Sequence, residues 1–121
     1  MRWPLLLAAL ALAGCEHVNG NVTVDGRPFV VDRCRNGAPF GFAGVQLEDA
    51  QGRHLRLVND PVTGAVQVGV FPAPAVDGTS LGQCASGSIQ STRAWAKGHV
   101  TLDCEGHGHT AHGKLDFVDC G

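Results

Sequence analysis

Three histidines near the carboxyl end of the chain have the type and spacing that a metal site requires. His107 and His109 are two residues apart, so in extended backbone both rings project to one face, and His112 could approach them across a loop. Neutral imidazoles suit Zn²⁺ or Cu²⁺, with Glu105 or His99 as a fourth ligand. An exposed turn fits the same segment, because its glycines permit positive φ and its other residues are polar. We favour the turn, predict no resident cofactor, and keep zinc or copper binding as the alternative.

Two other groups have catalytic residue types without the setting that catalysis needs. The segment Gly78-Thr79-Ser80-Leu81-Gly82 matches Gly-x-Ser-x-Gly, a pattern that presents a serine nucleophile only between a strand and a helix of a parallel sheet. No helix is expected here, so we interpret the match as chance. Asp116 and Asp119 are a candidate acid/base pair, but on a strand they project to opposite faces. We therefore predict no catalytic residues and no enzymatic activity.

Strands are the elements that must position all of these residues. Apolar and polar residues alternate with a period of two through most of the chain after residue 20, and no stretch there has the 3.6-residue period of a helix. The segments with this alternation are residues 22–25, 45–48, 54–57, 66–70, 99–104 and 114–117, with a weaker one at 88–93. Segments 45–48 and 54–57, on either side of Ala50-Gln51-Gly52, predict the clearest hairpin. Prolines and glycines at 71–82 predict a long loop instead of a strand.

The number of short strands and the turns between them predict an all-β fold. Each strand has one apolar and one polar face, which suits two antiparallel sheets packed against each other. We therefore expect a small antiparallel β-sandwich of about eight strands, with disulfides. A small β-barrel is the alternative.

The first fifteen residues have the features of an export signal. Arg2 is followed by the apolar run Leu5 to Ala13, which is too short to cross a bilayer, since a membrane-spanning helix needs about 20 apolar residues. The run ends in Leu12-Ala13-Gly14-Cys15, which resembles the lipobox of bacterial lipoproteins. That resemblance implies that residues 1–14 are a signal peptide, that Cys15 carries fatty acyl chains such as palmitate, and that the mature protein begins there. We expect residues 15–20 to be a tether and 21–121 a single β-domain.

The remaining cysteines form an even set suited to disulfides. The chain has five cysteines, and setting Cys15 aside leaves Cys34, Cys84, Cys104 and Cys120. If residues 99–104 and 113–119 form a hairpin around a loop at 106–113, Cys104 and Cys120 lie some 20 Å apart, beyond the roughly 7 Å that a disulfide spans. This favours Cys84 with Cys104 and Cys34 with Cys120. The argument fails if the two segments lie in different sheets.

The charge distribution argues against nucleic acid as a partner. The chain has 9 Lys and Arg against 11 Asp and Glu, a net charge of −2. Its densest basic stretch, Arg27, Arg33 and Arg35, is interleaved with Asp25 and Asp32. Phosphate binding requires a continuous basic face, which this pattern does not supply.

The domain also bears a faint resemblance to uncharacterised β-rich lipoproteins of predatory soil bacteria, in the segments Phe42-Ala43-Gly44-Val45-Gln46-Leu47 and Gly98-His99-Val100-Thr101-Leu102-Asp103-Cys104. This resemblance implies no activity and no functional residues. We expect a non-enzymatic cell-envelope lipoprotein, a binding or structural module of unknown ligand, held by its N-terminal lipid on the periplasmic or surface face of the outer membrane. The alternative is a periplasmic metal-binding protein that uses the histidine loop.

Overall fold

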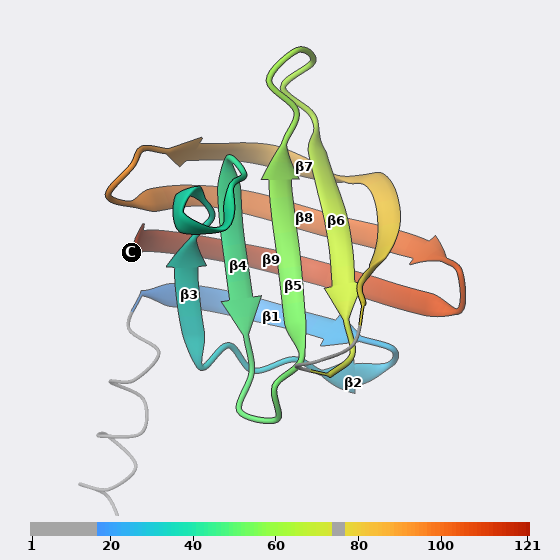
Figure 1. The fold of residues 1–121 in the computed structure, drawn as a ribbon. Coiled ribbons are helices and arrows are strands. Elements are labelled where there is room, and N and C mark those ends of the chain that lie inside the picture. Colours follow the sequence, from blue (N-terminus) through green and yellow to red (C-terminus); the bar gives the residue numbers. More distant parts are fainter. Residues whose placement is uncertain (1–16, 74–76) are drawn as a thin grey trace, which may run out of the picture.

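The computed structural model describes residues 17–73 and 77–121, so the predicted signal peptide and Cys15 lie outside the described residues (Figure 1). The described part is all-β, with one short 3₁₀ helix, and its strand pairings are antiparallel. The elements are β1 (Val18–Val24), β2 (Arg27–Pro28), β3 (Arg33–Asn36), η1 (Ala38–Phe40), β4 (Gly44–Glu48), β5 (His54–Asn59), β6 (Val66–Phe71), β7 (Thr79–Ser91), β8 (Ala96–Gly106) and β9 (His109–Cys120).

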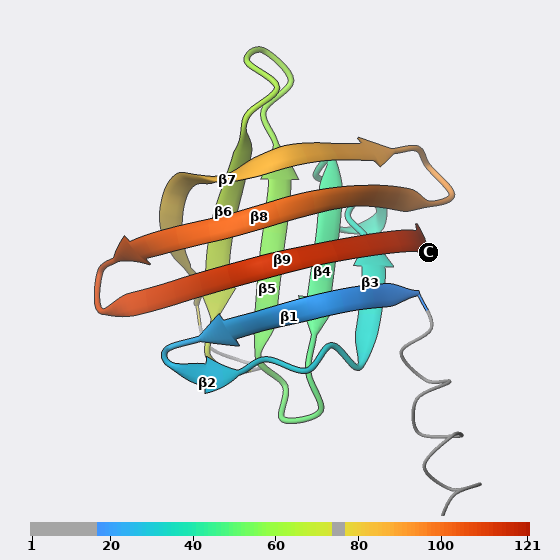
Figure 2. The same cartoon turned by 180° about the vertical axis from the view of Figure 1, so that it is seen from behind.

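The nine strands form one continuous sheet in the order β2-β1-β9-β8-β7-β6-β5-β4-β3. The sheet curls into a half-barrel, in which β3 to β6 form one layer and β1 with β7 to β9 form the other (Figures 1 and 2). The prediction of an antiparallel all-β fold is confirmed. The predicted pair of separate sheets is not what the described strands form, and the half-barrel is closer to the barrel alternative.

The long strand β7 is the reason that one sheet replaces two. Residues 79–85 of β7 pair with β6, and residues 85–91 pair with β8. A strand shared in this way makes a corner that joins two layers. Because β7 begins at Thr79, the predicted loop at 71–82 is shorter than expected. The glycines and serines of β7 give too weak an alternation to predict a strand of 13 residues.

The core lies between the two layers and follows the predicted alternation. The hairpin of β4 and β5 forms as expected, with Val45 opposite Leu57 and Leu47 opposite Leu55, and all four side chains are fully buried. The other buried apolar residues from predicted strands are Val22, Val24, Val66, Val68, Val70, Ile89, Val100, Leu102, Cys104, Leu115 and Phe117.

The two disulfides have the pairing that the hairpin argument favours. β8 and β9 are hairpin neighbours in the same sheet, with Cys104 opposite Ala111. Cys84 bonds to Cys104, beside the corner in β7, and Cys34 bonds to Cys120. The second bond joins β3, at one edge of the sheet, to the end of β9 in the other layer.

The first strand begins at Val18, within the segment 15–20 that was predicted to be a tether. Val18 pairs with Phe117, and the main-chain N–H of Val118 donates to the carbonyl oxygen of His17 at 3.0 Å. Residues 18–20, predicted as tether, therefore belong to β1. The polar sequence Asn19-Gly20-Asn21 hides this strand from a periodicity argument, because main-chain pairing with β9 forms it without apolar alternation.

Candidate functional site

The three candidate metal ligands do not come together. The chain turns over His107 and Gly108, at φ 53° and 81°, so β8 and β9 are joined by a two-residue turn in place of the expected loop at 106–113. Positive φ at both central residues is typical of the tightest hairpins. His109 and His112 lie in β9 three residues apart, so they project to opposite faces of the sheet.

Two of the three imidazoles contact carboxylates of their own. His109 Nδ1 lies 3.0 Å from an oxygen of Asp25, in the turn between β1 and β2. His112 Nδ1 lies 3.2 Å from Asp103 and its Nε2 3.9 Å from Glu105, both on β8. Within residues 17–73 and 77–121, no group of three or more His, Cys, Asp and Glu side chains is arranged to hold a metal ion.

The Asp25 contact changes the acidity of that carboxyl. Partial burial by itself raises the pKa of Asp25. The contact with His109 lowers this pKa, and so does the N–H of Thr110, which donates to Oδ1 at 3.0 Å; together they outweigh the effect of burial. The net effect places the pKa of Asp25 below its ordinary value of 3.8. Asp25 therefore joins the β1–β2 turn to the start of β9 as a carboxylate.

The serine pattern and the aspartate pair also lack a catalytic arrangement. Ser80 lies inside β7, and its hydroxyl accepts a 3.3 Å hydrogen bond from the N–H of Gly82, so it is not on a strand-to-helix turn. Asp116 pairs with His99 across β8 and β9, whereas Asp119 lies beyond it at φ 51°, beside the gap between β1 and β3.

Sequence analysis missed a polar row on the outer face of the second layer. The register places Ser88 opposite His99, and His99 opposite Asp116, on β7, β8 and β9. These three exposed side chains, with Lys97 and Val118, line an open depression of about 390 Å³. They form no hydrogen bond with one another in the described part of the chain. Only the strand register, which sequence spacing does not give, brings them together.

The depression can accept a polar ligand. Its volume lies within the usual range for small-molecule sites, roughly 300 to 1,000 Å³. It offers a hydroxyl, an imidazole, an ammonium group and a carboxylate from three neighbouring strands. The described hydroxyl and imidazole form no hydrogen bond with each other, whereas an activated serine nucleophile is hydrogen-bonded to its base.

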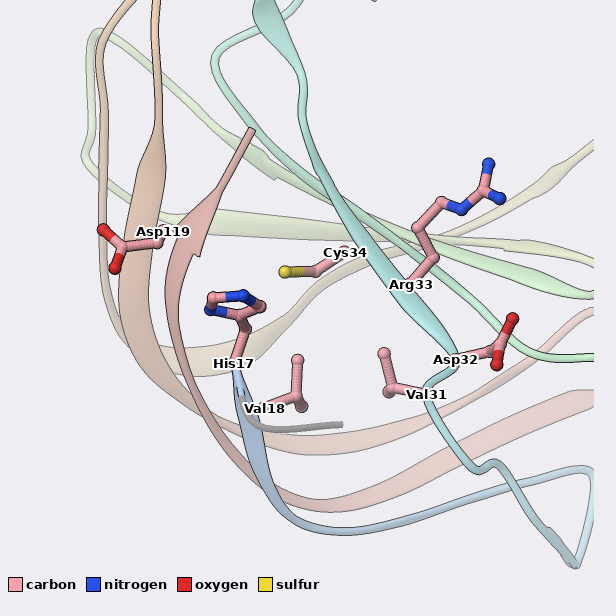
Figure 3. Close-up of a pocket in the computed structure, with 7 residues that line it drawn as sticks. All are labelled: His17, Val18, Val31, Asp32, Arg33, Cys34 and Asp119. Carbon is pink, nitrogen blue, oxygen red and sulfur yellow. The ribbon is translucent and has the colours of Figure 1, made fainter. Parts of the chain in front are cut away.

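A second hollow lies where the sheet is open, between β1 and β3 (Figure 3). Its volume is about 160 Å³, below the usual range for ligand sites. His17, Val18, Val31 and Cys34 gather around it, whereas the charged side chains of the same rim point away from one another (Figure 3). The hollow therefore has no convergent charges to bind an ion.

The outer face of the first layer is covered by its own side chains. The guanidinium of Arg56 lies 4.8 Å from the ring centres of both Phe42 and Phe71, and its Nη2 donates to Gln46 at 2.8 Å. Gln46 in turn donates to Glu48 at 2.7 Å. Cation–π contacts and charged hydrogen bonds of this kind fix side chains in place. We interpret this cluster as structural.

Comparison with known proteins gives no family for the chain: no family model, no curated protein and no solved structure matches it. In the described residues, none of the helical structure is long and apolar enough to span a bilayer.

Proposed function

We propose that this chain is a lipid-anchored lipoprotein of the cell envelope, whose β-domain acts as a non-enzymatic binding or structural module. The observation that carries the proposal is the place of Cys15, directly after an apolar run and a Leu-Ala-Gly sequence that resembles a lipobox. Several acyl chains on one cysteine bind a membrane far more firmly than one chain does.

The cysteine pairing supports this role for Cys15. The four cysteines of the β-domain pair with one another, so none of them is available to Cys15. Disulfides also suit an exported protein, because the cytosol keeps thiols reduced. We infer from this context a location at the outer membrane, on its periplasmic or surface face.

The absence of an assembled catalytic group among residues 17–73 and 77–121 favours binding over chemistry. Ser80 is tied to its own strand, and His109 and His112 contact separate carboxylates. The open depression lined by Ser88, His99 and Asp116 is the place where we expect a small polar ligand to bind. Metal binding by the histidine turn is not proposed, because His109 and His112 project to opposite faces of β9.

Expression in a Gram-negative host with labelled palmitate tests the anchor. The wild-type protein should take up label and sediment with membranes. Cys15→Ala should take up none, whereas Cys34→Ala, which removes a disulfide cysteine from the domain, is the matched control and should still be labelled. Equal labelling of the wild type and Cys15→Ala would refute the proposal.

A further inference from the structure

Three exposed apolar residues of the domain belong to elements that lie at one end of the half-barrel. Five large apolar residues are exposed among those described, and three of them are Phe40 at 44%, Trp95 at 36% and Val118 at 48%. They belong to η1, to the turn between β7 and β8, and to the last part of β9. Figures 1 and 2 agree that these three elements lie at the end of the half-barrel where β1 begins.

One buried residue holds these elements together. Asn36, 1% exposed, donates from Nδ2 to the carbonyl oxygen of Thr92 at 2.7 Å, in the turn that carries Trp95. Its Oδ1 accepts from the N–H of Ala38 in η1 at 3.3 Å, and its own N–H donates to the carbonyl oxygen of Gly121 at 3.3 Å. The β7–β8 turn, η1 and the end of the chain after β9 are thus held together at this end of the domain.

The proposed anchor is attached to the same end. The N–H of Val118 donates to the carbonyl oxygen of His17, and only Glu16 separates His17 from Cys15. Two residues of extended chain reach about 7 Å. A lipid on Cys15 therefore keeps His17, and with it Val118, within a short distance of the bilayer.

The residue types at this end suit a phospholipid surface. Lys97 Nζ lies 5.7 Å from the centre of the Trp95 ring, and Arg93 is exposed in the same turn. Tryptophan favours the boundary between acyl chains and headgroups, and basic side chains favour anionic headgroups. Asp119 is an acidic residue at this end. The opposite end, around the β8–β9 turn, carries Asp103 and Glu105 and suits an anionic surface poorly.

We infer that the end bearing Phe40, Trp95 and Val118 lies against the phospholipid bilayer to which Cys15 anchors the chain, so that the β8–β9 turn faces away from the membrane. This inference rests on the proposed lipid anchor. It goes beyond the anchor because it assigns one end of the folded domain to the membrane.

Trp95 supplies the measurement, because the only other tryptophan, Trp3, lies in the predicted signal peptide. The mature protein is purified from membranes of a host grown with labelled palmitate and reconstituted into vesicles of phosphatidylethanolamine and phosphatidylglycerol. We expect brominated acyl chains to quench Trp95 relative to the same vesicles without bromine, and its emission to shift to shorter wavelength. Trp95→Phe with Glu105→Trp moves the reporter to the opposite end and should abolish the quenching.

A matched pair of variants tests the assigned surface. Val118→Glu should still carry label and sediment with the vesicles but lose most of the quenching of Trp95. Val62→Glu makes the same change at an exposed residue of the β5–β6 loop and should be quenched like the wild type. Labelled wild-type protein without quenching, or equal quenching in both variants, would overturn this inference and leave the anchor standing. Absence of label would overturn both.

Discussion

Asn36 and Thr92, 56 residues apart in the sequence, are joined by a 2.7 Å hydrogen bond from the Asn36 amide to the Thr92 carbonyl oxygen. Asn36 lies in β3, in the first layer, and Thr92 lies in the turn after β7, in the second. The bond therefore connects the two layers at the end where the sheet is open. Because Asn36 is buried, water cannot take the place of its amide without a rearrangement.

Replacing Asn36 should destabilise the domain more than replacing a similar but less buried asparagine. Asn36→Ala leaves the Thr92 carbonyl oxygen and the Ala38 N–H without this partner, at a cost of about 1 to 3 kcal/mol in the free energy of unfolding. Asn59→Ala is the control, because Asn59 donates to the carbonyl oxygen of Ile89 at 2.8 Å from a partly exposed position. Urea denaturation measures both. A larger loss in Asn59→Ala would contradict the assigned role.

The two disulfides should contribute unequally to stability. Cys34 and Cys120 are separated by 86 residues, and Cys84 and Cys104 by 20. A cross-link that closes a longer loop removes more conformational entropy from the unfolded chain. For these two loop lengths, the difference in the free energy of unfolding is about 1 kcal/mol. We expect the Cys34→Ala, Cys120→Ala variant to unfold at lower urea concentration than the Cys84→Ala, Cys104→Ala variant. The reverse order would show that the entropy of the unfolded chain does not decide which disulfide stabilises the domain more.

The contact of Asp25 with His109 predicts a pH dependence of stability. The pKa of Asp25 is lower in the folded protein than in the unfolded chain, where it is close to 3.9. The Asp25 carboxylate therefore stabilises the fold above the unfolded pKa, and this stabilisation is lost as the pH falls through the folded pKa. Asp25→Asn should therefore lower stability at pH 7, and the difference from wild type should close below about pH 4. Asn tolerates the φ of 55° at this turn.

Asp103→Asn is the control for that measurement. Asp103 also contacts a histidine, but its side chain is 86% exposed, so its pair is screened by water. We expect a much smaller change in stability at pH 7. If both variants lose the same stability, or if the Asp25→Asn difference persists at low pH, the contact is not the cause.

Metal binding gives a direct test of the histidine geometry. Because His109 and His112 face opposite sides of β9, we expect calorimetric titration with Zn²⁺ or Cu²⁺ to show no tight site in the mature protein. A tight site that weakens as the pH falls through about 6.5 and disappears in His109→Ala, His112→Ala would mean that the turn rearranges around the metal.

The amino-acid sequence predicts the strands whose alternation is strong and the contacts that follow from them. The hairpins of β4 with β5 and β8 with β9 were expected from alternating residues, and the second hairpin also favours the observed disulfide pairing. The half-barrel was not expected, because it depends on β7. In that strand Ile89, 7% exposed, is the only buried residue, so periodicity gives no sign of the corner.

The candidate site shows the same limit. The metal hypothesis assumed a loop, but His107 takes a positive φ, which is uncommon outside glycine, and this shortens the connection to two residues. The polar row of Ser88, His99 and Asp116 comes from the register of β7, β8 and β9. Register depends on packing and bulges across the whole sheet, so residues far apart in sequence become neighbours without a local signal.

The close main-chain approach of β1 to β9 at Gly113 gives the last prediction. Gly113 pairs with Leu102 on one side and Val22 on the other, at φ 136°. A Cβ at this position would overlap the carbonyl oxygen of Asn21 on β1. Because both the φ and the close approach favour glycine, Gly113→Ala should lower the free energy of unfolding by about 2 to 4 kcal/mol.

Gly106→Ala is the matched control for this substitution. Gly106 lies in the neighbouring strand β8, and a Cβ there would meet no atom within 4 Å. Alanine at Gly106 should therefore change stability by no more than about 0.5 kcal/mol. Urea denaturation of the two variants measures the difference. If Gly113→Ala is as stable as Gly106→Ala, the close approach of β1 to β9 does not require glycine.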